Sequence, residues 1–180
     1  RGICFLPSGS SLVPLFCIRK NSILDYPGSS PFSRRGILSW PDICSHAQKI
    51  VATYQVQTPD IYLQAAKLSG GNKQRLSLGR KIESNPRLLI ANHPTKGLDI
   101  SSQNFIYERL SLLRDRGSTI LFIGTDLDEL FRICDRLLVI YRGEIVGCFD
   151  DPSKVSKLDV GVLMTGGASY IDNAEKRRQK

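Results

Sequence analysis

The spacing of hydrophobic and polar residues changes along the chain. Residues 1 to about 45 are irregular, with the string PGSSPFSRRG in their middle, and they predict loops with one short strand over 2–6. Apolar residues then recur at helical spacing over 41–55, which predicts a helix, and a second loop follows. The first third of the chain is therefore expected to supply few regular elements.

Regular elements follow from Ser69 onward. Serine often caps helices, and the helix that Ser69 begins is expected to end near Ser84, before Asn85-Pro86. The remaining predicted elements are a strand over 88–91, a helix over 101–116, a strand over 118–123, a short helix over 127–133, and a hairpin of strands over 136–141 and 144–149. Strands that alternate with helices at this spacing indicate an α/β fold with a largely parallel sheet.

Composition narrows the function classes only slightly. The net charge of +8 would suit nucleic acid, but part of it lies in the tail 176–180, and no basic stripe is interleaved with aromatic residues. Five cysteines stand singly, which argues against a disulfide framework and against a zinc site. No apolar run approaches the ~20 residues that cross a bilayer. We therefore expect neither a nucleic-acid partner nor a protein-held metal.

Three single residues have simpler expected roles. His46, on the helix over 41–55, is expected at the surface. Trp40, the only tryptophan, is expected to serve packing. Asp126 is expected to cap the short helix that follows it.

The string LSGGNKQ, residues 68–74, carries the most specific chemistry in the sequence. Ser69, Gly70 and Gly71 place a hydroxyl and two unhindered backbone N–H groups at the start of a predicted helix. Such a helix end attracts anions, because its dipole and its unpaired amides both face outward. A serine-capped, glycine-rich turn without any ligand is the alternative for these three residues taken alone.

Three strings together carry a family resemblance: LSGGNKQ, then NPRLLIANHPTKGLD, then DLDELFRICDRLLVIYRGEIVG. Over residues 59–167 the sequence resembles the nucleotide-binding domain of an ABC transporter, and more narrowly the C-terminal ATPase half of tandem importers for simple sugars and nucleosides. The resemblance implies an α/β, P-loop NTPase-like (ABC ATPase) core with a largely parallel sheet flanked by helices. It divides the chain into a Q-loop remnant with irregular loops and a helical signature-motif subdomain (1–85), a C-terminal α/β ATPase core (86–168) and a solvated basic tail (169–180).

The resemblance also assigns roles to individual residues. The signature motif, which contacts the γ-phosphate of ATP held by the opposite domain, matches Ser69, Gly70, Gly71, Asn72 and Gln74. Asp99 matches the D-loop aspartate, which lies across the interface between two ATPase domains, and Ser8 stands at the Q-loop position. The implied cofactors are ATP and Mg²⁺, at a composite site shared with a partner domain.

The sequence departs from the family at the positions that hydrolyse ATP. The P-loop string G-x-x-x-x-G-K-[S/T], which lies in the N-terminal Walker A part of the family's core, does not occur in these 180 residues. Asn92 and His93 stand where the family has the Walker B Asp for Mg²⁺ and the catalytic Glu. Thr125 stands at the position of the switch histidine. His93 is either a weak candidate base or an ordinary polar residue at a strand end.

These matches and departures predict a catalytically degenerate component of a sugar- or nucleoside-type ABC importer. It would donate its signature to a partner's ATP site and be inactive as an isolated chain. The implied partners are a second ATPase domain and transmembrane permease subunits, and the implied location is cytoplasmic, on the inner face of the cell membrane. Two alternatives stay open: a truncated remnant or interaction fragment without nucleotide binding, and an anion or nucleic-acid binder that uses the positive charge.

Overall fold

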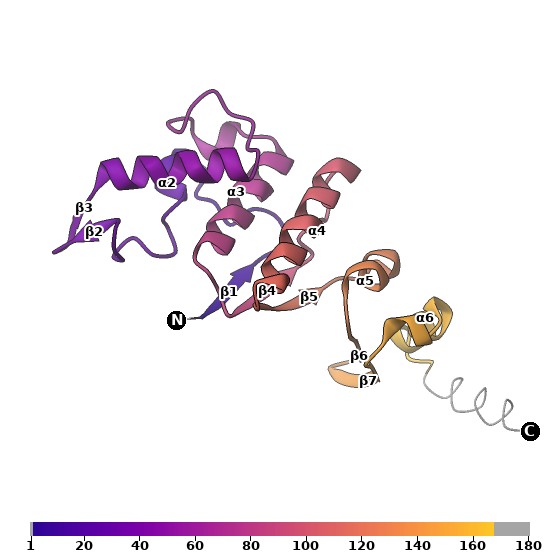
Figure 1. Cartoon of the computed structure of the whole chain (residues 1–180). Coiled ribbons are helices and arrows are strands. Elements are labelled where there is room, and N and C mark those ends of the chain that lie inside the picture. The colour runs from indigo at the N-terminus through magenta and orange to yellow at the C-terminus, as the bar shows by residue number, and fades with distance from the viewer. Residues whose placement is uncertain (1, 168–180) are drawn as a thin grey trace, which may run out of the picture. The chain divides into compact units, whose positions relative to one another are not determined.

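The structure is a computed structural model that describes residues 2–167 and contains two compact units (Figure 1). Of the described residues, 2–123 form the first unit and 124–167 the second. The tail expected over 169–180 lies outside the described residues.

The first unit is built on a sheet of three parallel strands. They are β1 (Ile3–Leu6), β4 (Leu88–Asn92) and β5 (Thr119–Ile123), in the order β1-β4-β5. Leu6 pairs with Ala91, and Asn92 pairs with Ile123, so the carboxyl ends of the strands reach the same edge of the sheet. The predicted α/β fold is confirmed, and β1 joins β4 across the boundary expected at residue 85.

Four α-helices belong to the described part of this unit. They are α1 (Ile18–Asn21), α2 (Trp40–Thr53), α3 (Gly70–Glu83) and α4 (Ile100–Asp115), with a 3-10 turn, η1, over Ala65–Lys67. The helices α2, α3 and α4 agree with the predicted ones to within two residues at each end. In Figure 1, α3 and α4 lie beside the sheet, where α3 packs on β1, α4 packs on β5, and α2 packs on α3.

Residues 1–45 contain more structure than their sequence pattern predicts. The helix α1 and the two-residue strands β2 (Ser33–Arg34) and β3 (Ile37–Leu38) lie there. The fully buried side chain of Asn21 donates to the Val13 carbonyl at 3.1 Å and accepts from the Val13 amide at 2.8 Å. A side-chain anchor of this kind has no periodic signature, which is why the pattern indicated only loops.

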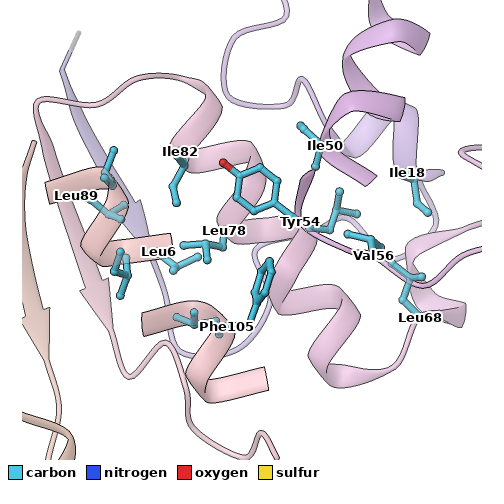
Figure 2. Packing of buried hydrophobic residues seen from close by; sticks show 14 residues of the cluster. Leu6, Ile18, Ile50, Tyr54, Val56, Leu68, Leu78, Ile82, Leu89 and Phe105 are labelled. Carbon is cyan, nitrogen blue, oxygen red and sulfur yellow. The ribbon is translucent and has the colours of Figure 1, made fainter. Parts of the chain in front are cut away.

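The core of the first unit lies between one face of the sheet and the helices (Figure 2). Leu6 of β1 and Leu89 of β4 are completely buried, in one cluster with Leu78 of α3. Tyr54, just after α2, and Phe105 of α4 belong to the same cluster. Each aliphatic side chain buried in this way contributes roughly 1.5–3 kcal/mol relative to exposure. Packing in this cluster therefore contributes to fixing the positions of β4, α3 and α4.

The opposite face of the sheet is apolar and uncovered. Ile3 is 70% exposed, Phe5 48%, Leu121 46% and Ile123 42%. Parallel sheets are normally buried on both faces. Within the described part of the first unit, helices cover only one of the two faces.

The second unit is a hairpin packed with two helices. Its elements are α5 (Leu127–Ile133), β6 (Leu137–Tyr141), β7 (Glu144–Phe149), the 3-10 turn η2 (Pro152–Lys154) and α6 (Lys157–Met164). Arg142 and Gly143 both have positive φ, 49° and 86°, as a tight two-residue turn requires, and the predicted hairpin is confirmed. Asp126 accepts from the amides that begin α5, which confirms its capping role. The helix α6 has no counterpart among the predicted elements.

Candidate functional site

The amino end of α3 is held open by a serine cap. Ser69 has extended backbone angles, and its Oγ accepts from the amide of Asn72 at 3.4 Å and from the Asn72 side chain at 3.0 Å. The Asn72 Oδ1 in turn accepts from the amide of Gln57 at 2.9 Å, which ties the preceding loop to the helix. The predicted cap is confirmed, and Asn72 serves to brace it.

Gly70 and Gly71 leave two backbone N–H groups without an acceptor among residues 2–167. A Cβ on Gly70 would meet no atom within 4 Å, so the packing of this chain does not require glycine there. A Cβ on Gly71 would come within 3.1 Å of the Ser102 Oγ, so Gly71 lets α3 approach α4 closely. Two free amides at a helix start, beside a hydroxyl, form a site suited to a phosphate oxygen.

Gln74 points into the protein. Its side chain is 3% exposed, and its Nε2 donates to the Pro94 carbonyl at 2.9 Å. Its Oε1 is buried without a partner among the described residues. The resemblance places Gln74 in the signature that contacts ATP in trans, but here its amide connects α3 to the loop after β4.

Asp99 caps α4. Its Oδ1 accepts from the Ser101 hydroxyl at 2.6 Å and the Ser102 amide at 2.9 Å, and its Oδ2 accepts from the Ser102 hydroxyl at 2.9 Å. These hydrogen bonds, that of Ser101 foremost, hold the pKa of Asp99 well below its usual range. Because the same Ser102 hydroxyl faces Gly71, the expected D-loop residue and the signature are brought together.

The strand β4 ends without an acid. Asn92 is its last residue, and His93 follows with a φ of 45°. The His93 amide donates to the Ile123 carbonyl at 2.8 Å, and its own carbonyl accepts from the Lys96 amide at 3.2 Å. Both side chains are half-buried. The hydrogen bonds that hold this turn therefore need no acidic side chain at position 92 or 93.

Ser8 and Thr125 are less closely tied to this site. Ser8 is exposed and lies just beyond β1, at the sheet edge that β4 and Asn92 also reach. Thr125 is exposed in the second unit, where it precedes α5. Its role at the switch position stays a prediction from the sequence.

The residues present could bind the phosphate of ATP–Mg²⁺ but do not suit the Mg²⁺ ion. The free amides at the amino end of α3 suit a phosphate presented from outside the chain. Mg²⁺ prefers carboxylate and phosphate oxygens, and Asn92 and His93 offer a neutral amide and an imidazole. Between residues 2 and 167 no group of three or more His, Cys, Asp or Glu could hold a metal ion. The contribution of this chain to ATP binding is therefore described without a metal ion held by its own residues.

Sequence reasoning missed Arg80, the residue that anchors α3. Its side chain is 2% exposed, its Nε lies 2.8 Å from an Asp25 carboxylate oxygen, and its Nη2 donates to the Ser11 carbonyl at 2.9 Å. Burial lowers the pKa of Arg80, and the Asp25 charge opposes that shift. Arg80 lies one helical turn after the buried Leu76, and this spacing was the available signal.

The expectation for His46 was wrong. His46 is half-buried, its Nε2 lies 2.9 Å from the Tyr26 hydroxyl, and its ring centroid lies 4.7 Å from that of Phe32. Burial lowers the pKa of His46. A cavity of about 940 Å³ adjoins it, but the lysines on its wall are paired, Lys49 with Glu83 and Lys81 with Asp25. The periodicity of α2 did not reveal this contact, because its partners lie in a loop.

Known proteins resemble the chain in sequence. The guanosine import ATP-binding protein NupO of Bacillus subtilis (strain 168) is 37% identical over 155 residues, which cover 86% of this chain and 30% of that protein. A ribose import ATP-binding protein, RbsA of Oceanobacillus iheyensis, is 33% identical over 149 residues, which cover 81% of this chain and 30% of that protein. The chain thus spans less than a third of the length of these curated relatives.

Solved structures resemble the chain in fold. A dimeric ATP-binding cassette in a post-hydrolysis state, bound to ADP and Pi, superposes with a TM-score of 0.69 at 24% identity and covers 82% of this chain and 62% of its own. No model of a known protein family matches the sequence. The chain therefore belongs to the ABC transporter ATP-binding proteins and corresponds to part of one ABC ATPase domain.

Proposed function

We propose that this chain is a nucleotide-binding component of a sugar- or nucleoside-type importer and supplies its signature, Ser69–Gly71, to ATP held by a partner domain. One observation carries the proposal: two amides at the start of α3 have no acceptor among residues 2–167, beside a glycine that the chain's own packing does not require. A bare Cα at Gly70 lets an external group approach the backbone closely.

The comparisons support the transport class and the shared site. One relative is named for guanosine import and another for ribose import. The structural neighbour is a dimer bound to ADP and Pi. In the proposed complex, the partner domain holds the phosphates and this chain closes over them.

The proposed contact is electrostatic. The amides of Gly70 and Gly71 donate to the γ-phosphate, and the Ser69 hydroxyl donates its own proton to it while still accepting from Asn72. Donors that are already oriented stabilise the charge of a transferring phosphoryl group without reorganisation. The chain thus contributes to binding and positioning at a site whose other half lies elsewhere.

We also propose that the chain alone does not hydrolyse ATP. Asn92 carries no charge with which to bind Mg²⁺, and His93 cannot replace a carboxylate in that task. His93 stays a weak candidate base for the attacking water, and Thr125 a substituted switch residue. Asp99 and Ser8 would contribute at the interface and at the Q-loop position.

The proposed partners are a second ATPase domain and transmembrane permease subunits. This assembly would place the chain on the cytoplasmic face of the membrane. Of the helices that the structure describes, none is both long enough and apolar enough to span a bilayer.

The test is a titration with Mg-ATP of the 180-residue chain alone and of its mixture with an ABC ATPase domain that carries a P-loop. We expect no binding by the chain alone and tighter ATP binding by the mixture than by the partner alone. Ser69→Arg should abolish the gain, because a long side chain would fill the approach to the amides. Ser156→Arg is the matched control, since Ser156 caps α6 in the same way and lies outside the proposed site.

Three results would count against the proposal. Tight ATP binding by the chain alone would mean that it holds a phosphate cradle of its own. An equal loss with Ser69→Arg and Ser156→Arg would reduce the signature effect to general instability. No gain in the mixture would favour a remnant without nucleotide binding.

A further inference from the structure

Exposed aromatic rings gather around one arginine of the first unit. The Arg19 guanidinium carbon lies 4.6 Å from the ring centroid of Trp40 and 4.6 Å from that of Tyr62. Trp40 is 40% exposed and Tyr62 60%. Beside them the Lys20 Nζ lies 5.5 Å from the ring of Phe16, which is also exposed. We call these five residues the Arg19 patch. Trp40 does serve packing, as expected, but on a surface arginine.

The backbone holds the Arg19 patch in place. The Arg19 amide donates to the Ile61 carbonyl at 3.0 Å, directly before Tyr62. The Asn21 side chain donates to the Phe16 carbonyl at 3.0 Å, which fixes the segment before α1. Trp40 is the first residue of α2, and α2 packs on α1. The rings are therefore ordered before any partner arrives, which lowers the entropy cost of binding.

The charges of the Arg19 patch are not compensated within the described chain. Neither Arg19 nor Lys20 forms an ion pair with a carboxylate of residues 2–167. The Arg19 Nη1 faces the Cys44 sulfur at 3.7 Å, and its Nε is buried without an acceptor. The Cys17 thiol is a second hydrogen-bonding neighbour of this guanidinium. The neighbours of the guanidinium within the described chain are thus weakly accepting sulfurs, which a carboxylate oxygen would outcompete as an acceptor.

This combination matches the chemistry of protein recognition. Trp, Tyr and Arg dominate the energetics of protein interfaces, where an apolar ring and a fixed donor act together. A guanidinium stacked on rings keeps its edge free for a carboxylate, and such charge-assisted hydrogen bonds are strong. An uncompensated cation among apolar rings is thus complementary to a carboxylate flanked by apolar side chains.

We propose that the Arg19 patch docks a peptide segment of a partner protein that carries a carboxylate side chain beside apolar ones, with the carboxylate bound at the edge of Arg19. The inference goes beyond nucleotide binding, because it uses no residue of the signature or of the loop after β4. It can therefore fail or succeed independently of the proposed function.

The only tryptophan of the chain makes the test direct. Trp40 emission is followed while the chain, without nucleotide, is titrated with a capped Leu-Glu-Leu-containing peptide into the millimolar range. A peptide with Gln in place of Glu is the ligand control. We expect a saturable change that is about tenfold weaker with the Gln peptide and about tenfold weaker for Arg19→Gln, as a charge-assisted hydrogen bond implies.

Two further variants separate recognition from folding. Arg19→Lys keeps the charge but loses the planar guanidinium that stacks on Trp40 and Tyr62, and it should bind more weakly than the parent with the same circular dichroism. Arg34→Lys, an exposed residue of β2, should bind like the parent. Equal binding of the Glu and Gln peptides, or no saturable change, would overturn the proposal. A Trp40 response only to vesicles of anionic lipid would also overturn it, in favour of a membrane surface.

Discussion

The amino end of α3 and the carboxyl end of β4 differ in whether they present groups that could bind ATP–Mg²⁺. At α3, the groups that could touch a phosphate are all present: the Ser69 hydroxyl and the two free amides after it. At β4, the strand and its turn are intact, but Asn92 and His93 bring no carboxylate. The first end thus presents hydrogen-bond donors to an anion, while the second presents no acidic side chain to a cation.

The difference follows from what holds each end in place. The end of β4 is fixed by buried Leu89 and Ala91 and by the backbone hydrogen bond of His93 to Ile123, and none of these needs an acidic side chain. Its residues could change without loss of the fold. The backbone amides of α3 do not depend on side-chain identity, so of the possible substitutions only proline would remove an N–H group. The donors at α3 thus belong to the backbone, whereas a metal ligand at the end of β4 would have to be a side chain.

The largest expected effect tests whether the buried contacts of Arg80 hold α3, and with it the free backbone amides at its start, in place. Arg80→Met removes one partner of a buried ion pair and leaves Asp25 with Lys81 alone, which should cost about 3 kcal/mol of the free energy of unfolding. Urea denaturation measures this loss. Arg34→Met, at an exposed position, should change it by less than about 0.5 kcal/mol. Equal effects at the two positions would show that α3 needs no such anchor.

Two glycines of the same helix should separate packing from chemistry. A Cβ on Gly79 would lie 2.7 Å from the Tyr54 ring and 2.9 Å from Ile50, so Gly79→Ala should destabilise the fold by about 1–3 kcal/mol. Gly70→Ala has open space and should be neutral, or stabilising by up to about 1 kcal/mol. Thermal unfolding compares the pair.

Gly70→Ala should also be tested for ATP binding in the mixture with a P-loop-bearing domain. A stable Gly70→Ala chain that weakens ATP binding would identify Gly70 as a glycine kept for an external ligand. Undiminished ATP binding by that variant would remove the main support for the signature contact.

At β4, the backbone should matter more than the imidazole. His93 has a φ of 45°, a left-handed conformation that glycine adopts freely and β-branched residues resist. His93→Val should lower the free energy of unfolding by about 1–2 kcal/mol, and His93→Gly should leave it unchanged or raise it. Chemical denaturation of both variants is the measurement. A loss of similar size in His93→Gly would show that the imidazole itself supports the strand end.

The smallest expected effect is the pH dependence of stability that arises from the half-buried His46. Burial lowers its folded pKa, so the unfolded chain binds more protons below about pH 6.5, and stability should fall as pH drops through the folded pKa. Urea midpoints between about pH 7.5 and 5 should decline less steeply in His46→Gln than in the parent. An identical decline in His46→Gln and the parent would contradict the burial argument.

The sequence predicted those elements whose packing is periodic. The strand β4 and the helices α3 and α4 follow from apolar spacing, and the Ser69 and Asp126 caps follow from residue type and position. The anchors Asn21 and Arg80 could not be predicted in the same way, because their partners are loop groups that no helix or strand period marks: the Val13 backbone for Asn21, and the distant Ser11 for Arg80. Burial of a polar residue depends on such partners, and no local pattern records them.

Within the candidate site, too, the sequence predicted local features but not the partners that side chains find elsewhere in the fold. The position of the signature at a helix start was predictable, since Gly-Gly after a serine defines it. The inward direction of Gln74 was partly predictable, because it lies one turn before buried Leu78. Its bond to Pro94 was not, because the carbonyl belongs to a loop whose conformation depends on a positive φ at His93.

The hydrogen bond between Gln74 and Pro94 has a mechanical consequence. It joins the helix that begins with the signature to the loop that follows β4, and Ser102 adds a second point of contact between Gly71 and the start of α4. A displacement of α3 must therefore carry that loop with it or break a buried bond. The amino end of α3 and the loop after β4 are therefore mechanically coupled, and we expect a ligand that displaces one of them to displace the other as well.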